Sequence, residues 1–210
     1  MAKDAALQRL ISAMAVPGVL IDHRIISGGD ELCLLPDELG AFATSVLKVR
    51  RASGAARIVA RELLLDLGYP HQAIPKSALG VPIWPFGIVG SLAHDSRVAV
   101  AAVAMHRDFC SVGIDVEPTE EIDADICDLI LTESERQTAH KIPHFGRLIF
   151  AVKEAVYKAV YPLDRIFLEH HDVEVSLSAG TAAVRTGRVV PFRYCVGAHI
   201  VALASIPSSP

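Results

Sequence analysis

The chain has 210 residues, enough for one large domain or two small lobes with a substantial core. Apolar residues make up 51% of it and charged residues 21%, which argues against an intrinsically disordered chain. The net charge is −4, so no overall excess of basic residues indicates a nucleic acid or a membrane surface as a partner. An anionic ligand would therefore have to be bound by a local cluster of basic side chains.

The N-terminal segment 10–21, LISAMAVPGVLI, could pass for the core of a signal peptide. Asp4 precedes it, Pro–Gly interrupts it and no clean cleavage site follows, so we expect a short helix that turns into a strand. No run of the chain is long enough to span a membrane. Four cysteines lie far apart and form no CxxC pair, which argues against a zinc site and fits a cytoplasmic protein: Cys33, Cys110, Cys127 and Cys195.

Two helical segments are expected next. Residues 34–49 open with Pro–Asp–Glu, a helix-start signal, and residues 50–68 continue as a helix with an apolar stripe. Arg50, Arg57 and Arg61 lie seven and four residues apart, so they share the side opposite that stripe. Three arginines on one side of a helix can serve solubility or bind phosphate, and the spacing alone does not decide between the two.

The segment 71–96 is rich in Pro and Gly and is predicted as a loop followed by the short strand GIVGS. His94 follows this strand, and a single histidine in a loop is ordinarily structural or exposed. The apolar run 97–105 is predicted as a buried strand.

The segment SVGIDVEP, 111–118, alternates as a strand does. Its valine and isoleucine side chains fall on one face, and Asp115 and Glu117 fall on the other. Carboxylates on the wet face of an antiparallel strand are unremarkable, although Asp is disfavoured in strands. The alternation alone therefore does not mark a site.

The segment FAVKEAVYKAVYP, 150–162, is a helix by its apolar spacing, with Pro162 as the expected end. Glu154 and Lys158 stand at i and i+4, the common spacing of a surface ion pair. Taken alone, these charges indicate a solvated helix face.

The two halves of the chain have a similar make-up. The second half has a helix capping pattern in TESE, at 132–135, and strands expected within 164–180 and 188–206. Each half contains helical segments that lead into strands, and each ends in an apolar strand, which indicates a duplicated α+β unit. We place an N-terminal lobe at residues 1–108 and a C-terminal lobe at 109–210.

Acidic and basic side chains from these segments define a candidate site. If Asp115, Glu117 and Glu154 come together, their charges repel unless a divalent cation lies among them, and oxygen-only ligands of this kind suit Mg²⁺. Lys153 and Lys158, with the basic residues of the first half, would complete a site for a ligand with several phosphates. The residues alone therefore favour Mg²⁺-dependent phosphoryl chemistry.

Two motifs resemble the paired signature of the 4′-phosphopantetheinyl transferase superfamily. They are VGIDVEP and, about forty residues later, FAVKEAVYKA. The resemblance is strongest to its single-chain surfactin-synthetase and enterobactin-synthetase type. Three further segments are similar to segments of the family, so the resemblance covers roughly residues 34–178. They are VRRASGAARIVARELLLDLG, GVPIWPFGIVGSLAHD and RIFLEHHDVEV. It implies an α+β fold of two similar lobes, packed as an intramolecular pseudo-dimer with the site between them.

The resemblance also implies a reaction. The 4′-phosphopantetheine arm of coenzyme A passes to a serine of an apo acyl or peptidyl carrier protein, and 3′,5′-ADP leaves. Mg²⁺ would lie on the pyrophosphate, held by Asp115, Glu117 and Glu154, with Glu154 as the general base. Lys158 would stabilise the pyrophosphate, and Lys153 would share that role or orient Glu154. The enzyme is expected to act as a monomer.

By match of position, the resemblance assigns contacts with the coenzyme A phosphates to Arg50, Arg57, Lys76 and His94, with Ser91 and its neighbouring backbone N–H groups adding donors. The chain departs from the family pattern at Ala93, at Ala52–Ser53 and after Lys76, and these departures leave the three carboxylates unchanged.

Carrier proteins are commonly acidic, and candidate contacts for one within 119–147 are Arg136, Lys141 and Arg147, although scattered surface bases are also ordinary. Two other functions stay open. The first is a Mg²⁺-dependent phosphohydrolase or nuclease, which would share the acidic cluster. Nucleases with the pattern Asp…Glu-x-Lys place the lysine two residues after the carboxylate, whereas Lys158 is four residues after Glu154. The sequence also shows no basic surface for a nucleic acid. A non-catalytic coenzyme A-binding module would be expected to lose a metal ligand, and none is lost.

Overall fold

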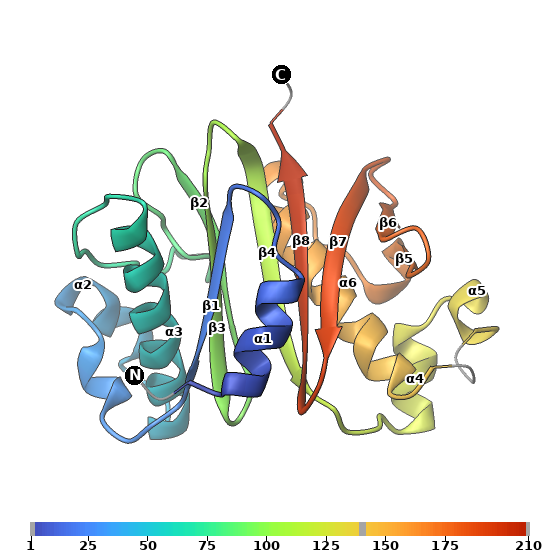
Figure 1. Cartoon of the computed structure of the whole chain (residues 1–210), viewed down its shortest axis with the longest axis horizontal. Helices are drawn as coiled ribbons and strands as arrows, with labels where there is room; N and C mark the ends of the chain where they lie inside the picture. The colour runs from blue at the N-terminus through green and yellow to red at the C-terminus, as the bar shows by residue number, and fades with distance from the viewer. Residues whose placement is uncertain (1–2, 139–141, 209–210) are drawn as a thin grey trace.

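The computed structural model describes residues 3–138 and 142–208. The described chain forms four layers, in the order helix, three-stranded sheet, five-stranded sheet, helix (Figure 1). None of its described helices is long and apolar enough to cross a membrane. Lys141, a candidate carrier contact, lies outside the described residues.

The first lobe is built on a three-stranded antiparallel sheet with the order β1-β3-β2. Helix α3 covers one face of this sheet, where Val59 and Leu63 pack with Ala101 and Val103. The elements in chain order are α1 (Ala5–Ala13), β1 (Val19–Ile25), the short 3₁₀ helix η1 (Asp30–Cys33), α2 (Pro36–Leu39), the 3₁₀ helix η2 (Gly40–Phe42), α3 (Leu47–Asp66), β2 (Ile88–His94) and β3 (Val98–Met105).

The second lobe is built on a five-stranded antiparallel sheet with the order β4-β8-β7-β6-β5. Helix α6 covers its outer face, where Ile149, Val152 and Val156 pack with Ile200 and Ala202. The elements are β4 (Phe109–Pro118), α4 (Ala124–Ile130), α5 (Glu133–Arg136), α6 (Phe145–Asp164), the 3₁₀ helix η4 (His170–Asp172), β5 (Val173–Ser176), β6 (Thr181–Val184), β7 (Val189–Val196) and β8 (His199–Pro207).

The two lobes share one order of connections. The first runs β1-α3-β2-β3 and the second β4-α6-β7-β8, and in each the last strand lies between the other two. The second lobe adds the β5–β6 hairpin at its outer edge. The expectation of two similar α+β lobes is therefore confirmed.

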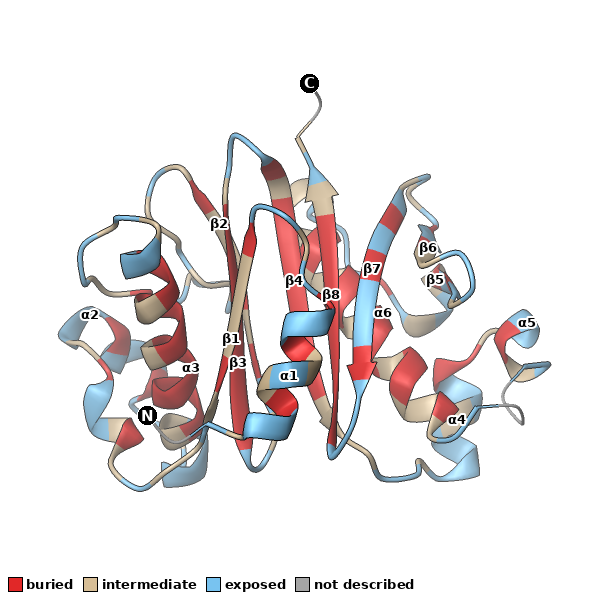
Figure 2. Cartoon of the chain, viewed as in Figure 1, coloured by how far each residue is buried: buried red, intermediate tan, exposed pale blue. Residues whose placement is uncertain are grey.

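The inner faces of the two sheets pack against each other. Val100 and Ala102 of β3 lie in one apolar cluster with Ile114 of β4 and with Val201 and Leu203 of β8. Figure 2 shows β3, β4 and β8 buried along most of their length. Burying each valine or leucine side chain contributes about 1.5–3 kcal/mol, so this shared core holds the lobes in a fixed relation.

Helix α6 approaches β4 closely at Gly113. An ideal Cβ at this position would lie 2.0 Å from the carbonyl oxygen of Ala155 and 2.6 Å from the backbone nitrogen of Ala159. The alternation predicted for β4 is correct, but the face with Asp115 is covered by α6 and buried, so the interpretation as a wet face is wrong. The predicted end of the helix is also wrong, because Pro162 lies within its last turn and α6 continues to Asp164.

The arginines of α3 do not lie on a solvent-facing side. Arg57 and Arg61 are both buried, because η1 and α2 pack against this side of the helix. Nη1 of Arg61 lies 2.9 Å from Oε1 of Glu38, and its Nη2 donates to the carbonyl oxygen of Cys33. The solubility interpretation is therefore wrong for Arg57 and Arg61, and Arg61 is engaged in a structural ion pair.

Candidate active site

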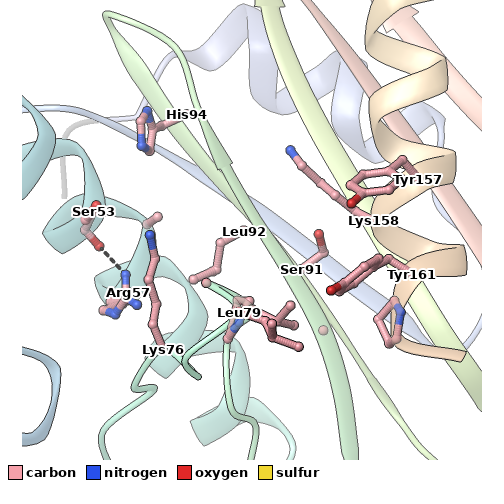
Figure 3. A pocket seen from close by; sticks show the side chains of 16 residues that line it. Ser53, Arg57, Lys76, Leu79, Ser91, Leu92, His94, Tyr157, Lys158 and Tyr161 are labelled. Atoms are coloured by element: carbon pink, nitrogen blue, oxygen red, sulfur yellow. Dashed lines mark hydrogen bonds between the residues drawn. The ribbon is translucent and has the colours of Figure 1, made fainter. Parts of the chain in front are cut away.

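A cavity of about 330 Å³ lies where the two lobes meet (Figure 3). The first lobe lines it with α3, the segment 76–82 and β2, and the second lobe lines it with α6. Four basic side chains reach it: Arg57 and Lys76 on one wall, His94 at the end of β2, and Lys158 on α6. This concentration of basic groups in a protein of net charge −4 suits a ligand with several negative charges.

The structure brings together most of the residues predicted to contact coenzyme A phosphates. The cavity is lined by Arg57, Lys76, Ser91, His94 and Lys158. Arg50 lies on the first turns of α3 and is not among the lining residues. His94 ends β2 instead of lying in a loop.

Two of the basic groups have lowered pKa values. Loss of water around the imidazole lowers the pKa of His94, and the charges of Lys158 and Lys76 act in the same direction. Burial lowers the pKa of Lys76, and the charge of Arg57 adds to the shift. A bound phosphate would offset both shifts, because a negative charge favours the protonated form of each group.

Asp115 is the most buried carboxylate of the predicted metal set. Its Oδ1 accepts a hydrogen bond from Nζ of Lys158 at 2.6 Å, whereas its Oδ2 is buried and has no hydrogen-bond partner. Burial raises the pKa of Asp115, and the charge of Glu154 adds to this effect while Lys158 opposes it. A buried carboxylate oxygen without a donor, in a set of oxygen ligands, fits a hard cation such as Mg²⁺.

The other two carboxylates have basic partners of their own. Oε2 of Glu117 lies 3.0 Å from Nη1 of Arg147, and burial followed by the charge of Asp115 raises the pKa of Glu117. Oε1 of Glu154 lies 3.6 Å from Nε2 of His170, and this contact lowers the pKa of Glu154 against the effect of burial. Over residues 3–138 and 142–208, no three Asp, Glu, His or Cys side chains are arranged as a ready metal cluster.

The structure does not bring Lys153 to these carboxylates. Its Nζ lies 2.8 Å from Oε2 of Glu135 and donates to the carbonyl oxygens of Ile130 and His170. Burial lowers the pKa of Lys153, and Glu135 opposes the shift. The buried ion pair ties α6 to α5, and the two carbonyl contacts tie α6 to α4 and η4, so the geometry favours a structural role for Lys153 over the predicted catalytic one.

Several residues at the site were not singled out from the sequence. Tyr157 and Tyr161 of α6 line the cavity (Figure 3), and Tyr157 also borders a second cavity of about 470 Å³ that reaches Glu154. Their spacing from Glu154 and Lys158 places all four on one helix face, a signal that could have been used. Of the candidate carrier contacts, Arg136 pairs with Asp128 and Glu133, while Arg147 lies beside the site.

Comparison with known proteins identifies the family. Residues 37–104 match the 4′-phosphopantetheinyl transferase N-terminal domain, and residues 111–204 match the 4′-phosphopantetheinyl transferase superfamily. The chain therefore belongs to the 4′-phosphopantetheinyl transferase superfamily, as the two sequence motifs indicated.

Individual relatives support the same assignment. The 4′-phosphopantetheinyl transferase Npt of Nocardia iowensis is 37% identical over 82% of this chain and 79% of its own length. The 4′-phosphopantetheinyl transferase Svp of Streptomyces mobaraensis is 32% identical over 84% of this chain and 76% of its own length. Enterobactin synthase component D of Salmonella typhi is 32% identical over 56% of this chain and 50% of its own length, which supports the resemblance to the enterobactin-synthetase type.

Proposed function

We propose that the cavity between the lobes binds coenzyme A, and that the chain transfers the 4′-phosphopantetheine arm to a serine of an apo carrier protein. The serine oxygen bonds to the phosphorus that carries the pantetheine arm, the bond from this phosphorus to the bridging oxygen breaks, and 3′,5′-ADP leaves. The observation that carries the proposal is the interlobe cavity with its four basic groups, one of which, Lys158, pairs with the buried carboxylate of Asp115.

The basic wall of the first lobe binds the phosphates. Coenzyme A carries a diphosphate and a further phosphate on its ribose, so it needs several cations at separate points. Arg57, Lys76 and His94 supply them from the first lobe, and Ser91 adds a hydroxyl donor. Lys158 supplies a cation from the second lobe, close to the carboxylates. The complete set of basic groups therefore comes from both lobes.

Asp115, Glu117 and Glu154 would hold Mg²⁺. The support for this is the partnerless buried oxygen of Asp115 and the all-oxygen donor set. When bound, the metal neutralises charge on the diphosphate and on the leaving group. Glu117 and Glu154 now contact Arg147 and His170, and all four side chains are partly exposed. Each carboxylate can therefore exchange its basic partner for the metal.

Glu154 is the best placed residue to accept the proton of the serine hydroxyl. Contact with His170 lowers its pKa, so its carboxylate is ionised near neutral pH. It is partly exposed and borders the second cavity, through which a carrier serine can reach it. Lys158 lies near enough to act on Glu154 electrostatically and would stabilise the charge that builds on the diphosphate.

The proposal also covers the boundary between the lobes, the oligomeric state and the location in the cell. We place the boundary between the lobes at residues 108 and 109, in the connection from β3 to β4. The site is built from one chain, so we expect a monomer with an internal pseudo-twofold axis. The cysteines Cys33, Cys110, Cys127 and Cys195 are all free thiols, which fits a cytoplasmic enzyme.

The test is to mix the purified chain with coenzyme A and a panel of apo carrier proteins, with and without Mg²⁺, and to measure the intact mass of each carrier. We expect a carrier to gain one phosphopantetheine unit in the presence of Mg²⁺, and to gain none with the Asp115→Asn variant. Hydrolysis of coenzyme A without any gain of carrier mass would favour a phosphohydrolase. Binding of coenzyme A with neither reaction would favour a binding module.

A further inference from the structure

A single aromatic ring lies against two of the phosphate-binding cations. Phe42, on η2, is almost fully buried. The central carbon of the Arg57 guanidinium lies 4.8 Å from the centre of this ring, and Nζ of Lys76 lies 4.8 Å from the same point. Both distances are within the range of cation–π contacts, so one ring contacts both charges.

Arg57 and Lys76 lie against the same ring although their positive charges repel each other. Burial lowers the pKa of Lys76, and the nearby positive charge of Arg57 lowers it further. The negative face of an aromatic ring offsets part of that cost without supplying a full negative charge. A carboxylate in the place of Phe42 would neutralise the cations and compete with an anionic ligand. The ring keeps both positive charges available.

Glu38 also lies close to the guanidinium of Arg57. This carboxylate is fully buried, pairs with Arg61 at 2.9 Å and lies 3.6 Å from Nε of Arg57. It also accepts the backbone N–H of Ile74 and of Leu35, so its position is determined by the fold.

Arg57 is held by further contacts that leave one nitrogen free. Its Nε donates to the carbonyl oxygen of Ile74, and its Nη1 donates to that of Ser53. Its Nη2 is buried and has no hydrogen-bond partner, although Arg57 lines the cavity. A buried donor without an acceptor is costly, and an anionic ligand in the cavity would satisfy it.

We propose that Phe42 is a positioning residue of the coenzyme A site: its ring holds Arg57 and Lys76 side by side, so that both cations bind one phosphate group of coenzyme A. The inference rests on the proposed function, because it takes coenzyme A as the occupant of the cavity. Phe42 does not itself touch the ligand and acts through the two cations.

The test compares Phe42→Leu, which keeps an apolar side chain of similar size without a ring, with Phe42→Tyr, which keeps the ring. Phe192→Leu is the matched control, because it removes a buried ring from the second lobe, away from the cavity. Calorimetry gives the Kd of each variant for coenzyme A, and steady-state assays give the KM for coenzyme A, the KM for the carrier and kcat. Thermal unfolding reports on the fold.

We expect Phe42→Leu to raise the Kd and the KM for coenzyme A about tenfold, which corresponds to about 1.4 kcal/mol, because both cation–π contacts are lost. The KM for the carrier and kcat should stay unchanged. Phe42→Tyr should stay within about threefold of the parent in its Kd for coenzyme A, and Phe192→Leu should lower the melting temperature without changing that Kd.

Unchanged coenzyme A binding in a folded Phe42→Leu variant would overturn the proposal, and so would an equal loss in Phe192→Leu. If Phe42→Leu does not fold, Phe42→Met fills the same space with a flexible side chain and is measured under the same criteria. Binding is measured directly, so the two proposals fail separately. Coenzyme A binding without carrier modification counts against the transferase, whereas transfer with unchanged binding in Phe42→Leu counts against the role of Phe42.

Discussion

Nζ of Lys158 lies 2.6 Å from Oδ1 of Asp115, and this contact joins helix α6 to strand β4 at the edge of the interlobe cavity. The same lysine donates to the carbonyl oxygen of Ile114, one residue earlier on the strand. The contact exists because α6 lies directly on Gly113, which sets the height of the helix above the strand. The position of helix α6 thus depends on a glycine outside the cavity.

Gly113→Ala should separate α6 from β4. The added methyl group would lie 2.0 Å from the carbonyl oxygen of Ala155, so the helix must move and the Asp115–Lys158 contact must lengthen. We expect the free energy of unfolding to fall by about 1–3 kcal/mol and kcat to fall with it. Urea unfolding and the transfer assay measure the two effects. Gly28→Ala is the control, because nothing lies within 4 Å of its added Cβ. Parental kcat in Gly113→Ala would show that the close contact does not position the site.

Glu154→Gln should abolish transfer and leave the fold intact. The side chain is partly exposed, so its loss costs little stability, while loss of a general base typically costs 10²–10⁴-fold in rate. Rapid-quench or steady-state transfer assays measure kcat, and circular dichroism checks the fold. Asp66→Asn, an exposed acid at the end of α3, is the control. Near-normal transfer by the folded Glu154→Gln variant would remove this residue from the mechanism.

Lys153→Met should destabilise the protein and leave catalysis unchanged. The substitution leaves the buried carboxylate of Glu135 without its partner, and breaking such a pair costs about 3–5 kcal/mol. We expect a large loss in urea unfolding and an unchanged kcat per folded molecule at low temperature. Adding Glu135→Leu should recover most of the stability. A reduced kcat with full stability would return Lys153 to the active site.

Lys76→Met should weaken coenzyme A binding selectively. Lys76 lines the cavity and lies beside Arg57, so its loss removes one of the four basic groups there. We expect the KM for coenzyme A to rise about tenfold, or about 1.4 kcal/mol, while the KM for the carrier is unchanged. Lys48→Met is the matched control, because Lys48 is exposed on the first turn of α3. Equal behaviour of the two variants would mean that Lys76 does not contact the ligand.

Asp95→Asn should show a pH-dependent loss of stability. Oδ2 of Asp95, between β2 and β3, lies 2.6 Å from Nδ1 of His199 on β8, so this buried pair links the lobes. Burial alone would raise the pKa of Asp95, but hydrogen bonds from His199 and from the backbone of Val98 and Arg97 hold it below its usual range. The folded protein therefore releases this proton more readily than the unfolded chain, and the pair stabilises the fold above about pH 4.

We expect Asp95→Asn to lose about 2 kcal/mol at pH 6, and the difference from the parent to shrink as the pH falls from about 4 toward 2. Urea unfolding over a pH series measures it. A difference that stays constant from pH 6 to pH 3 would show that the carboxylate charge of Asp95 does not stabilise the fold.

The sequence predicts the elements that depend on local patterns. The alternation in β4, the apolar spacing of α6, the capping box at Thr132 and Glu135, and the turn after α1 are all found where expected. The short strand β6 was not predicted, because four residues are too few for a clear alternation.

The sequence could not predict which face of each helix is buried by distant segments. Lys153 and Lys158 both interrupt an apolar helix, but Lys158 pairs with Asp115 of β4 and Lys153 pairs with Glu135 of α5, a difference that only tertiary packing decides. Glu38 has the sequence context of an ordinary acid at a helix start, and its burial depends on Arg61, which is 23 residues further along the chain. Contacts between residues this far apart in the sequence leave no periodic signal in it.

The repeated order of strands and helices makes α3 and α6 equivalent elements of two copies, yet they carry different chemistry. The lobe with α3 lines the cavity with Arg57, Lys76 and His94, which we propose bind phosphate, and the lobe with α6 carries Lys158 and Glu154. The β5–β6 hairpin and helices α4 and α5 have no counterpart in the first lobe, so we expect substitutions there to alter the choice of carrier and to leave the proposed coenzyme A contacts of the first lobe unchanged.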